Sequence, residues 1–393
     1  MEKKQLSDKR LHLITINFVL IAFMLGCNEF MVVGNLSLIA SSFNVSLASI
    51  SVLVSVFAWT YAILTPIITA LTNKINRFTL LIVLLIIFML GTLLTFAAPS
   101  YGWLVAGRIL TASVAGVIES LMQAIAYQIA NTQKQQSSMV SWVYTGFSVA
   151  SILGLPIGTF IAEIWSWHIS FLMVAVCTLV ATIITAILVP KKIPYHGSGL
   201  KGQLIIFKDR RIWLGVVFCI CVGATLYGYY TYIRELITQS LGLGSFLTVI
   251  LLAMGILNLL GTQWGGHLAE HDGMKRCLPY YFGMALILVF FPVLLKNSWS
   301  GLLMLSAFAV LTALAASPAQ IFFLNLATQE YPTAVSLTSS LNAVAYNIGV
   351  AIASLTAGQF LKVWGLGSLG YNSLIYCLIA IAALLLLGKI KNK

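Results

Sequence analysis

Long runs of apolar residues, separated by short polar segments, make up most of the chain. Each run is close to the ~20 residues that a helix needs to cross the ~30 Å hydrocarbon core of a bilayer. The runs are too long and continuous for the alternating strands of a membrane barrel, and open sheet edges are excluded in lipid. The pattern predicts twelve transmembrane helices, at residues 13–38, 47–72, 78–97, 102–130, 137–163, 168–189, 212–238, 244–269, 277–295, 299–326, 333–359 and 370–388.

One polar segment occurs twice, each time after the second predicted helix of a half. Residues 71–77 are echoed by residues 268–273, an offset of 268 − 71 = 197 in a chain of 393. A duplicated membrane half is the plan of a secondary transporter. We therefore expect an all-α integral membrane protein of two pseudo-symmetric six-helix bundles. The N-terminal bundle is expected at 1–189, a cytoplasmic linker at 190–211 and the C-terminal bundle at 212–393.

Composition and charge support this reading. Apolar residues form 60% of the chain and charged residues 8%, more apolar surface than a soluble protein can hide. Eighteen of the lysines and arginines fall at the termini and in the loops predicted on the same side, against at most three on the other. Because basic residues favour the cytoplasmic side, we expect both termini in the cytoplasm, and the net charge of +12 does not imply nucleic-acid binding.

The sequence contains no glycine-rich phosphate loop with its lysine, which argues against a nucleotide-driven pump. No nucleophile–base set clusters along the chain, so we do not expect an enzyme. We expect no cofactor and no metal site. The expected partners are a small-molecule substrate, protons and membrane lipid, and the protein is expected to be a monomer.

Ionisable side chains inside the predicted helices are the main candidates for function. Glu29 lies in the middle of the first helix and Arg108 in the fourth. Such groups are costly in lipid, so they are expected to face a wet cavity. A carboxylate beside an arginine can hold either a proton or the cation, which suits proton coupling. The alternative is a buried pair that ties two helices together.

Glu119 and Gln123 extend this polar stripe along the fourth helix. Eleven residues separate Glu119 from Arg108, which places the two on one helix face about 16 Å apart. Glu119 is therefore a candidate second proton site or substrate contact, with a local structural role as the alternative.

The predicted fifth helix carries small residues at every fourth position: Gly146, Ala150, Gly154, Gly158 and Ala162. Such a ladder lets a neighbouring helix approach closely. Pro156 removes one backbone hydrogen bond within it and softens the helix.

Several short segments, in this order and spacing, resemble the major facilitator superfamily, and within it the twelve-helix drug:proton antiporters near the bacterial sugar-efflux (arabinose or IPTG exporter) branch. The segments are Asn28-Glu29-Phe30 with Gly34, the 71–77 loop, Gly107-Arg108, Gly154-Leu155-Pro156-Ile157-Gly158, Trp167-His168-Ile169-Ser170-Phe171, Tyr230-Thr231-Tyr232-Ile233 and Asn347-Ile348-Gly349. In that family the glycine–proline motif of the fifth helix marks exporters, so the resemblance implies efflux.

The repeated loop departs unequally from the family form, Gly-x-Leu-Ala-Asp-Arg-x-Gly-Arg. The first copy has Asn73 in place of the acid, whereas the second keeps an acid at Glu270 and glycine at Gly273. Asparagine cannot form a charge pair, so a weaker cytoplasmic lock is expected in the first half. The residues expected to control conformation are Asn73, Arg77, Gly154, Pro156, Gly158, Glu270 and Gly273.

The seventh helix supplies aromatic faces with hydroxyl tips, which suit sugars or flat organic molecules. Beyond the tyrosines, Arg234 and Glu235 are expected either to form an outer-gate ion pair or to sit at the membrane interface. The candidate substrate-binding residues are Asn28, Glu29, Glu119, Gln123, Tyr227, Tyr230, Arg234, Asn342 and Asn347. Glu29, Arg108 and Glu119 are the candidates for proton coupling.

The sequence therefore predicts proton-coupled efflux of small organic molecules by alternating access, across the plasma (inner) membrane of a bacterium. Sugars or related polar metabolites are the favoured substrates, with drugs also open. The alternatives are a proton-linked importer of the same fold, a membrane receptor that transports nothing, and a membrane enzyme.

Overall fold

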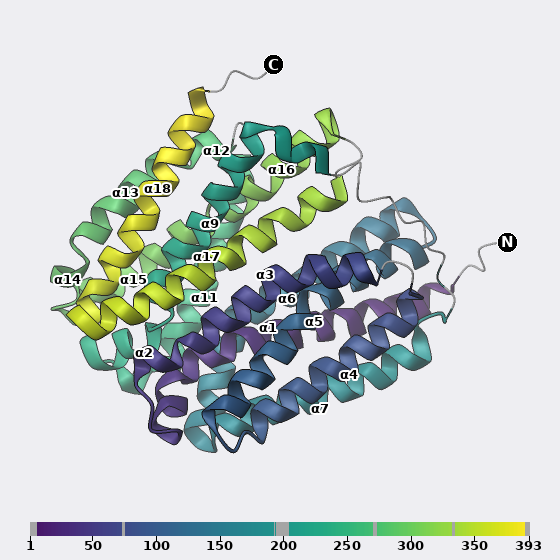
Figure 1. The fold of residues 1–393 in the computed structure, drawn as a ribbon, viewed down its shortest axis with the longest axis horizontal. Coiled ribbons are helices and arrows are strands. Elements are labelled where there is room, and N and C mark those ends of the chain that lie inside the picture. The colour runs from purple at the N-terminus through teal and green to yellow at the C-terminus, as the bar shows by residue number, and fades with distance from the viewer. Residues whose placement is uncertain are drawn as a thin grey trace. The chain divides into compact units, whose positions relative to one another are not determined.

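The computed structural model describes residues 6–72, 75–191, 193, 204–269, 273–331 and 335–389. Every regular element in these ranges is helical (Figure 1). Eleven helices within them are long and apolar enough to cross a membrane. The all-α membrane architecture predicted from the apolar runs is therefore confirmed.

In the first half of the chain, the described residues form six long helices and one short one. They are α1 (Asp8–Ser42), α2 (Leu47–Ile50), α3 (Val52–Leu71), α4 (Arg77–Phe96), α5 (Tyr101–Ile129), α6 (Gln133–Ile164) and α7 (Trp167–Leu188).

The second half contains more interruptions. Its elements are η1 (Leu204–Lys208), α9 (Arg210–Tyr230), α10 (Ile233–Glu235), η2 (Leu236–Ser240), η3 (Gly244–Phe246), α11 (Leu247–Ala269), α12 (Gly273–Arg276), α13 (Leu278–Val289), α14 (Phe291–Leu294), α15 (Ser298–Ala313), α16 (Ala316–Glu330), α17 (Val335–Trp364), η5 (Leu366–Ser368) and α18 (Leu369–Lys389).

The predicted span at 277–295 differs from the expectation of one continuous helix. It is divided into α13 and α14, with the break at Phe290. Pro292 lies two residues after the break, and proline has no N–H to continue the ladder and crowds the preceding turn. The spans predicted at 47–72, 212–238 and 299–326 are also divided among shorter elements. The eleven candidate spans include no helix from 277–295, which is why they stand beside twelve predicted ones.

The chain forms two compact units. One contains Met1–Asn35 and Ile63–Gly197, and the other contains Leu36–Ala62 and Ser198–Lys393. The second unit thus includes a segment from the first half of the chain: the end of α1, all of α2 and the start of α3. We call residues 36–62 the inserted segment. The division at 190–211 expected from the sequence remains a prediction.

In the first unit, α4 packs along α5 and α7, which lie beside it in Figure 1. The small-residue ladder of α6 faces α1. A Cβ atom on Gly146 would lie 2.4 Å from the carbonyl oxygen of Val19, and one on Gly158 would lie 2.5 Å from Met31 Cγ. The two backbones therefore approach as closely as the ladder predicts, which gives contact area where no hydrophobic force drives helix association.

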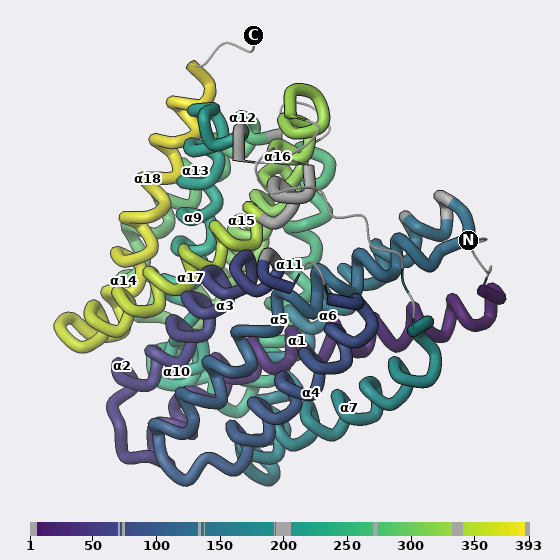
Figure 2. The backbone as a smooth tube through the Cα atoms, turned by 45° about the vertical axis from the view of Figure 1, so that its right-hand side comes forward, coloured from purple at the N-terminus to yellow at the C-terminus, as the bar shows by residue number. Residues whose placement is uncertain are grey.

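In the second unit, α9 packs between α17 and α18, and α13 runs beside α18 (Figure 2). The α9–α17 contact is backbone on backbone at Gly349, where a Cβ atom would lie 1.9 Å from the carbonyl oxygen of Ile220. Larger side chains here would force the two helices apart.

Candidate functional site

Arg108 is a fully buried cation on α5, with 1% of its surface exposed. Its Nη1 donates to the main-chain oxygen of Asn28 on α1 at 2.6 Å and to Asn28 Oδ1 at 3.0 Å. Asn28 Nδ2 in turn donates to Thr92 Oγ1 on α4 at 3.2 Å. Asparagine serves here because it accepts from the guanidinium and donates to a hydroxyl at once. Three helices of the first unit are thus tied together around one positive charge.

Glu29 follows Asn28 on α1 and is half-buried. The charges of both Arg108 and Glu119 act on this carboxyl group. The positive charge of Arg108 favours the ionised form of Glu29, and the negative charge of Glu119 disfavours it. Arg108 and Glu119, the other two residues predicted for proton coupling, therefore lie within electrostatic reach of Glu29, in the same unit. What each of them does in transport stays a prediction.

Glu119 and Gln123 are one turn apart on α5, and Gln123 Nε2 donates to Glu119 Oε1 at 3.5 Å. The hydroxyl group of Tyr144 on α6 lies within hydrogen-bonding reach of Gln123, and the charge of Glu119 also acts on it. Tyr144 is 46% exposed. Glu29, Arg108, Glu119, Gln123 and Tyr144 are together called the polar site below.

Tyr144 was not among the residues predicted from the sequence. A signal was present, however: Ser141, Tyr144, Thr145 and Ser148 are exposed and share the face of α6 that lies away from Gly146. Four hydroxyl groups on one face of a membrane helix are costly in contact with lipid, so the pattern indicates a wet surface. The glycine ladder drew attention to the opposite face of the same helix.

The tyrosines predicted for substrate contact form a separate aromatic cluster in the second unit. The ring of Tyr227 lies edge-on to Tyr230 and to Tyr346 of α17, with centroid separations of 5.7 and 6.4 Å. Asn342 Nδ2 donates to Gln320 Oε1 on α16 at 2.8 Å. Asn347 is 7% exposed and donates to the main-chain oxygen of Ala343 at 3.0 Å. The Asn342 bond joins α17 to α16, whereas the Asn347 bond lies within α17.

The predicted pair of Arg234 and Glu235 is not a hydrogen-bonded pair. Arg234 is half-buried, whereas Glu235 is completely buried and neither of its carboxyl oxygens has a hydrogen-bond partner. The charge of Arg234 still acts on Glu235.

The predicted conformational residues are only partly described. Asn73 and Glu270 lie outside the described residues, so the expected difference between their two loops stays a prediction. Arg77 begins α4 and Gly273 begins α12. The cap of α4 is Asn76, whose Oδ1 accepts from the main-chain nitrogen of Phe78 at 2.9 Å. Asn76 thus replaces the glycine of the family form with a functioning helix cap.

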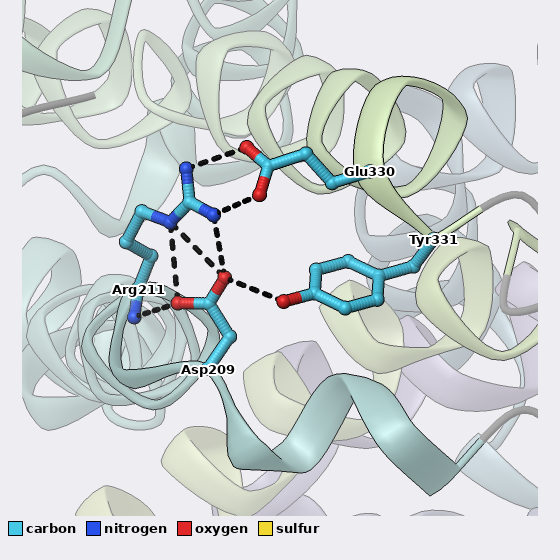
Figure 3. Close-up of polar contacts among 4 residues, drawn as sticks. All are labelled: Asp209, Arg211, Glu330 and Tyr331. Carbon is cyan, nitrogen blue, oxygen red and sulfur yellow. Dashed lines mark hydrogen bonds and ion pairs between the residues drawn. The ribbon is translucent and has the colours of Figure 1, made fainter. Parts of the chain in front are cut away.

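A cluster of charges at the start of α9 was also missed by the sequence reasoning (Figure 3). Arg211 lies between two carboxylates: its Nη1 donates to Glu330 Oε1 at 2.7 Å, and its Nη2 donates to Asp209 Oδ2 at 2.7 Å and also to Glu330 Oε2. The Tyr331 hydroxyl group donates to Asp209 Oδ2 at 3.3 Å. These residues join the start of α9 to the end of α16.

Asp209 is also the N-cap of α9, and its Oδ1 accepts from the main-chain nitrogen of Arg211 at 2.8 Å. Partial burial raises the pKa of the Asp209 carboxyl, but the hydrogen bonds and charge of Arg211 outweigh this effect. The pKa of Asp209 therefore lies below its usual value. The carboxylate stays ionised, so the cluster is a stable ionic tie at neutral pH.

The sequence pattern of the Major Facilitator Superfamily matches residues 18–354. The chain belongs to this superfamily. It is 30% identical over 340 residues to the uncharacterized MFS-type transporter YtbD of Bacillus subtilis (strain 168), covering 86% of this chain and 85% of that protein. It is also 30% identical over 372 residues to the uncharacterized MFS-type transporter YbcL of the same strain, covering 94% of each.

Two solved transporter structures share the fold of this superfamily member. The bacterial homolog of the human lysosomal transporter Spinster, inward-facing and unoccupied, matches with a TM-score of 0.77 at 14% identity over 98% of each chain. The nucleoside transporter NupG matches with a TM-score of 0.74 at 13% identity, over 97% of this chain and all of the other. At these identities the likeness establishes the fold alone.

Membership of the superfamily confirms the predicted transporter and rejects the enzyme alternative. The protein is a multi-pass membrane transporter of the bacterial MFS type, with a small molecule as its substrate. As a member of this superfamily it is a secondary transporter.

Proposed function

We propose that this MFS transporter exports small polar organic molecules in exchange for protons, with Glu29 as the coupling carboxyl group. The observation that carries the proposal is the placement of Glu29 beside one positive and one negative group, Arg108 and Glu119. A carboxyl group in such surroundings changes its proton affinity when water access or a substrate changes the balance. We further propose a monomer in the bacterial inner membrane, with both termini cytoplasmic.

In the proposed cycle, Glu29 takes up a proton from the outer solution. The neutral carboxyl group no longer attracts Arg108, which keeps its two hydrogen bonds to Asn28. Loss of that attraction shifts the equilibrium between the two access states. A shift from 99:1 to 1:99 needs about 5.5 kcal/mol of differential binding. One protonation together with substrate contacts is sufficient in magnitude.

The proposed substrates are sugars or related polar metabolites. Gln123, Tyr144 and the exposed hydroxyl groups of α6 present donors and acceptors without a fixed charge. Tyr227 and Tyr230 of the second unit present aromatic faces, which pack well on sugar rings. The resemblance to the sugar-efflux branch of the drug:proton antiporters supports the same class. Outward direction rests on the Gly154–Gly158 motif that this resemblance associates with export.

The test has two steps. A panel of sugars, polyols, nucleosides and cationic drugs is first screened for thermal stabilisation of the detergent-purified protein. The best binder is then followed in proteoliposomes with an imposed proton gradient. Glu29→Gln should abolish gradient-driven transport and keep binding, because glutamine mimics the protonated carboxyl group but cannot release a proton. The matched control is Glu163→Gln, an exposed acid near the end of α6, which should transport normally.

Gradient-driven transport at the wild-type rate in Glu29→Gln would reject Glu29 as the coupling site. Accumulation of the substrate in the direction of proton flow would identify an importer instead of an exporter. Glu119→Gln separates the two roles open for that residue: loss of binding indicates a substrate contact, and loss of coupling with intact binding indicates a second proton site.

A further inference from the structure

Glu235 lies beyond a break in the long helix that begins at Arg210. The helix α9 ends at Tyr230, the three-residue α10 follows, and a π-helical turn (η2) continues from Leu236. Interrupted helices in transporters often form ion and substrate sites, because backbone groups at the break are free to bind a ligand. Glu235 is therefore placed where such a site is built, at the end of α9 away from the Arg211 cluster.

The carboxyl group of Glu235 is buried without a hydrogen bond. Its relative exposure is 0%, and neither Oε1 nor Oε2 has a hydrogen-bond partner. The hydroxyl group of Ser37, on α1, is near the carboxyl but does not meet the geometry of a hydrogen bond. An ionised carboxylate in such a place would lose its hydration, and the charge of Arg234 does not outweigh this cost. The neutral, protonated form has no such cost.

The groups around Glu235 provide little to neutralise a negative charge. The inserted segment, residues 36–62, contains no Asp, Glu, Lys, Arg or His. Near Glu235 in its own segment, the charge of Arg234 acts on Glu235, and the charge of Glu235 acts on the hydroxyl group of Tyr232. From α17 the charged residue is Lys362, which is exposed one turn beyond Gly358. Ionisation of Glu235 would thus require water to enter.

The same region holds the inserted segment against the rest of the second unit. The Tyr232 hydroxyl group donates to the main-chain oxygen of Leu47 at 3.2 Å and lies beside Ser51. A Cβ atom on Gly358 of α17 would lie 2.9 Å from Ser51 Oγ. Ser51 is 0% exposed. Ser51 and Glu235 are therefore both closed to the surrounding solvent while the segment remains in place.

We propose that Glu235 is a proton-binding site separate from Glu29, and that its protonated form holds the inserted segment against α9, α10 and α17. Loss of the proton leaves a buried carboxylate that must be hydrated. Because the packing around Tyr232, Ser51 and Gly358 excludes water, hydration and release of the segment occur together. The site therefore makes the attachment of residues 36–62 depend on the pH of the solution at this end of α9.

The test measures exposure of the segment on the purified full-length protein in detergent and needs no transport. Ser51→Cys provides the reporter, and its rate of reaction with a maleimide is followed between about pH 5 and pH 8. The rate of the parent protein, which has its own six cysteines, is subtracted. The same reporter is placed in Glu235→Gln, which has the shape of the protonated acid and cannot ionise. Because the thiol is the same, its own titration cancels in the comparison.

Between about pH 5 and pH 8, the rate of maleimide reaction at Ser51→Cys should rise about tenfold more in the protein that keeps Glu235 than in the one that carries Glu235→Gln. Ser49→Cys, an exposed position of α2, should react equally in both backgrounds. Equal pH courses of Ser51→Cys in the two backgrounds would overturn the proposal. Should Ser51→Cys fail to fold, Ile50→Cys, at the neighbouring position and 0% exposed, provides the same readout.

Two further measurements separate this site from the proposed function. The infrared band of a protonated carboxylic acid should be weaker in Glu235→Gln than in the parent at neutral pH, and an unchanged band would overturn the proposal. In Glu29→Gln the pH response of Ser51→Cys should remain. Loss of the response in Glu29→Gln together with its persistence in Glu235→Gln would assign it to Glu29.

Discussion

The hydrogen-bonded chain from Arg108 through Asn28 to Thr92 predicts a measurable cost for Asn28→Leu. Leucine has the same number of side-chain heavy atoms as asparagine, with the same branching at Cγ, so the change removes the polar contacts and keeps a similar shape. It leaves the main-chain oxygen of Asn28 in place, 2.6 Å from Arg108 Nη1. It removes the Oδ1 acceptor at 3.0 Å and the Nδ2 donor to Thr92 at 3.2 Å.

The two lost bonds differ in strength. A hydrogen bond to a charged group contributes about 1.5–3 kcal/mol. A neutral bond between membrane helices contributes about 0.6 kcal/mol. Since Arg108 is 1% exposed, water cannot replace the lost acceptor. Asn28→Leu should therefore lower the free energy of unfolding by about 2–4 kcal/mol. Thr92→Val removes only the neutral end of the chain and should cost about 1 kcal/mol or less.

The free energies of unfolding are compared by equilibrium unfolding in mixed micelles, with Thr92→Val as the matched control. The double variant should cost about as much as Asn28→Leu alone, because both changes remove the same Asn28–Thr92 bond. If Asn28→Leu costs no more than Thr92→Val, within about 0.5 kcal/mol, the charged bond to Asn28 is not what stabilises Arg108.

Three further outcomes are expected. Gly146→Ala should destabilise the protein by about 1–3 kcal/mol because its methyl group would meet the Val19 carbonyl, whereas Gly283→Ala, with open space around it, should be neutral in the same unfolding assay. The pKa of Asp209 is lowered in the folded protein, so its carboxylate stabilises the fold at pH above its unfolded pKa of about 4. This contribution disappears as the pH falls through the folded pKa. Asp209→Asn should therefore lower the melting temperature at neutral pH and match the parent in acid. Tyr144→Phe should weaken substrate binding about tenfold, measured by calorimetry, without changing the melting temperature; unchanged affinity would remove Tyr144 from the polar site.

The apolar runs predicted the helices well because a membrane helix must satisfy its own backbone hydrogen bonds and be apolar over its length. The predicted span at 277–295 was less accurate, since two local features, the break at Phe290 and Pro292, divided it. Glu29, Arg108 and Glu119 could be selected by the cost of charge in lipid, which depends on the residue alone. Tyr144 could not be selected so easily, because a tyrosine is acceptable in both wet and lipid-facing places.

The sequence by itself determined the helical membrane fold, the duplicated plan and the ionisable groups of the first unit, because burial in lipid imposes strong one-dimensional rules on a chain. The tertiary structure alone decided which groups meet. It paired Arg108 with the side-chain and main-chain oxygens of Asn28 on α1 and joined Arg211 to Glu330, 119 positions away. It also left the Glu235 carboxyl group buried without a hydrogen-bond partner. Such contacts depend on helix rotation and packing over long sequence separations, which hydropathy does not encode.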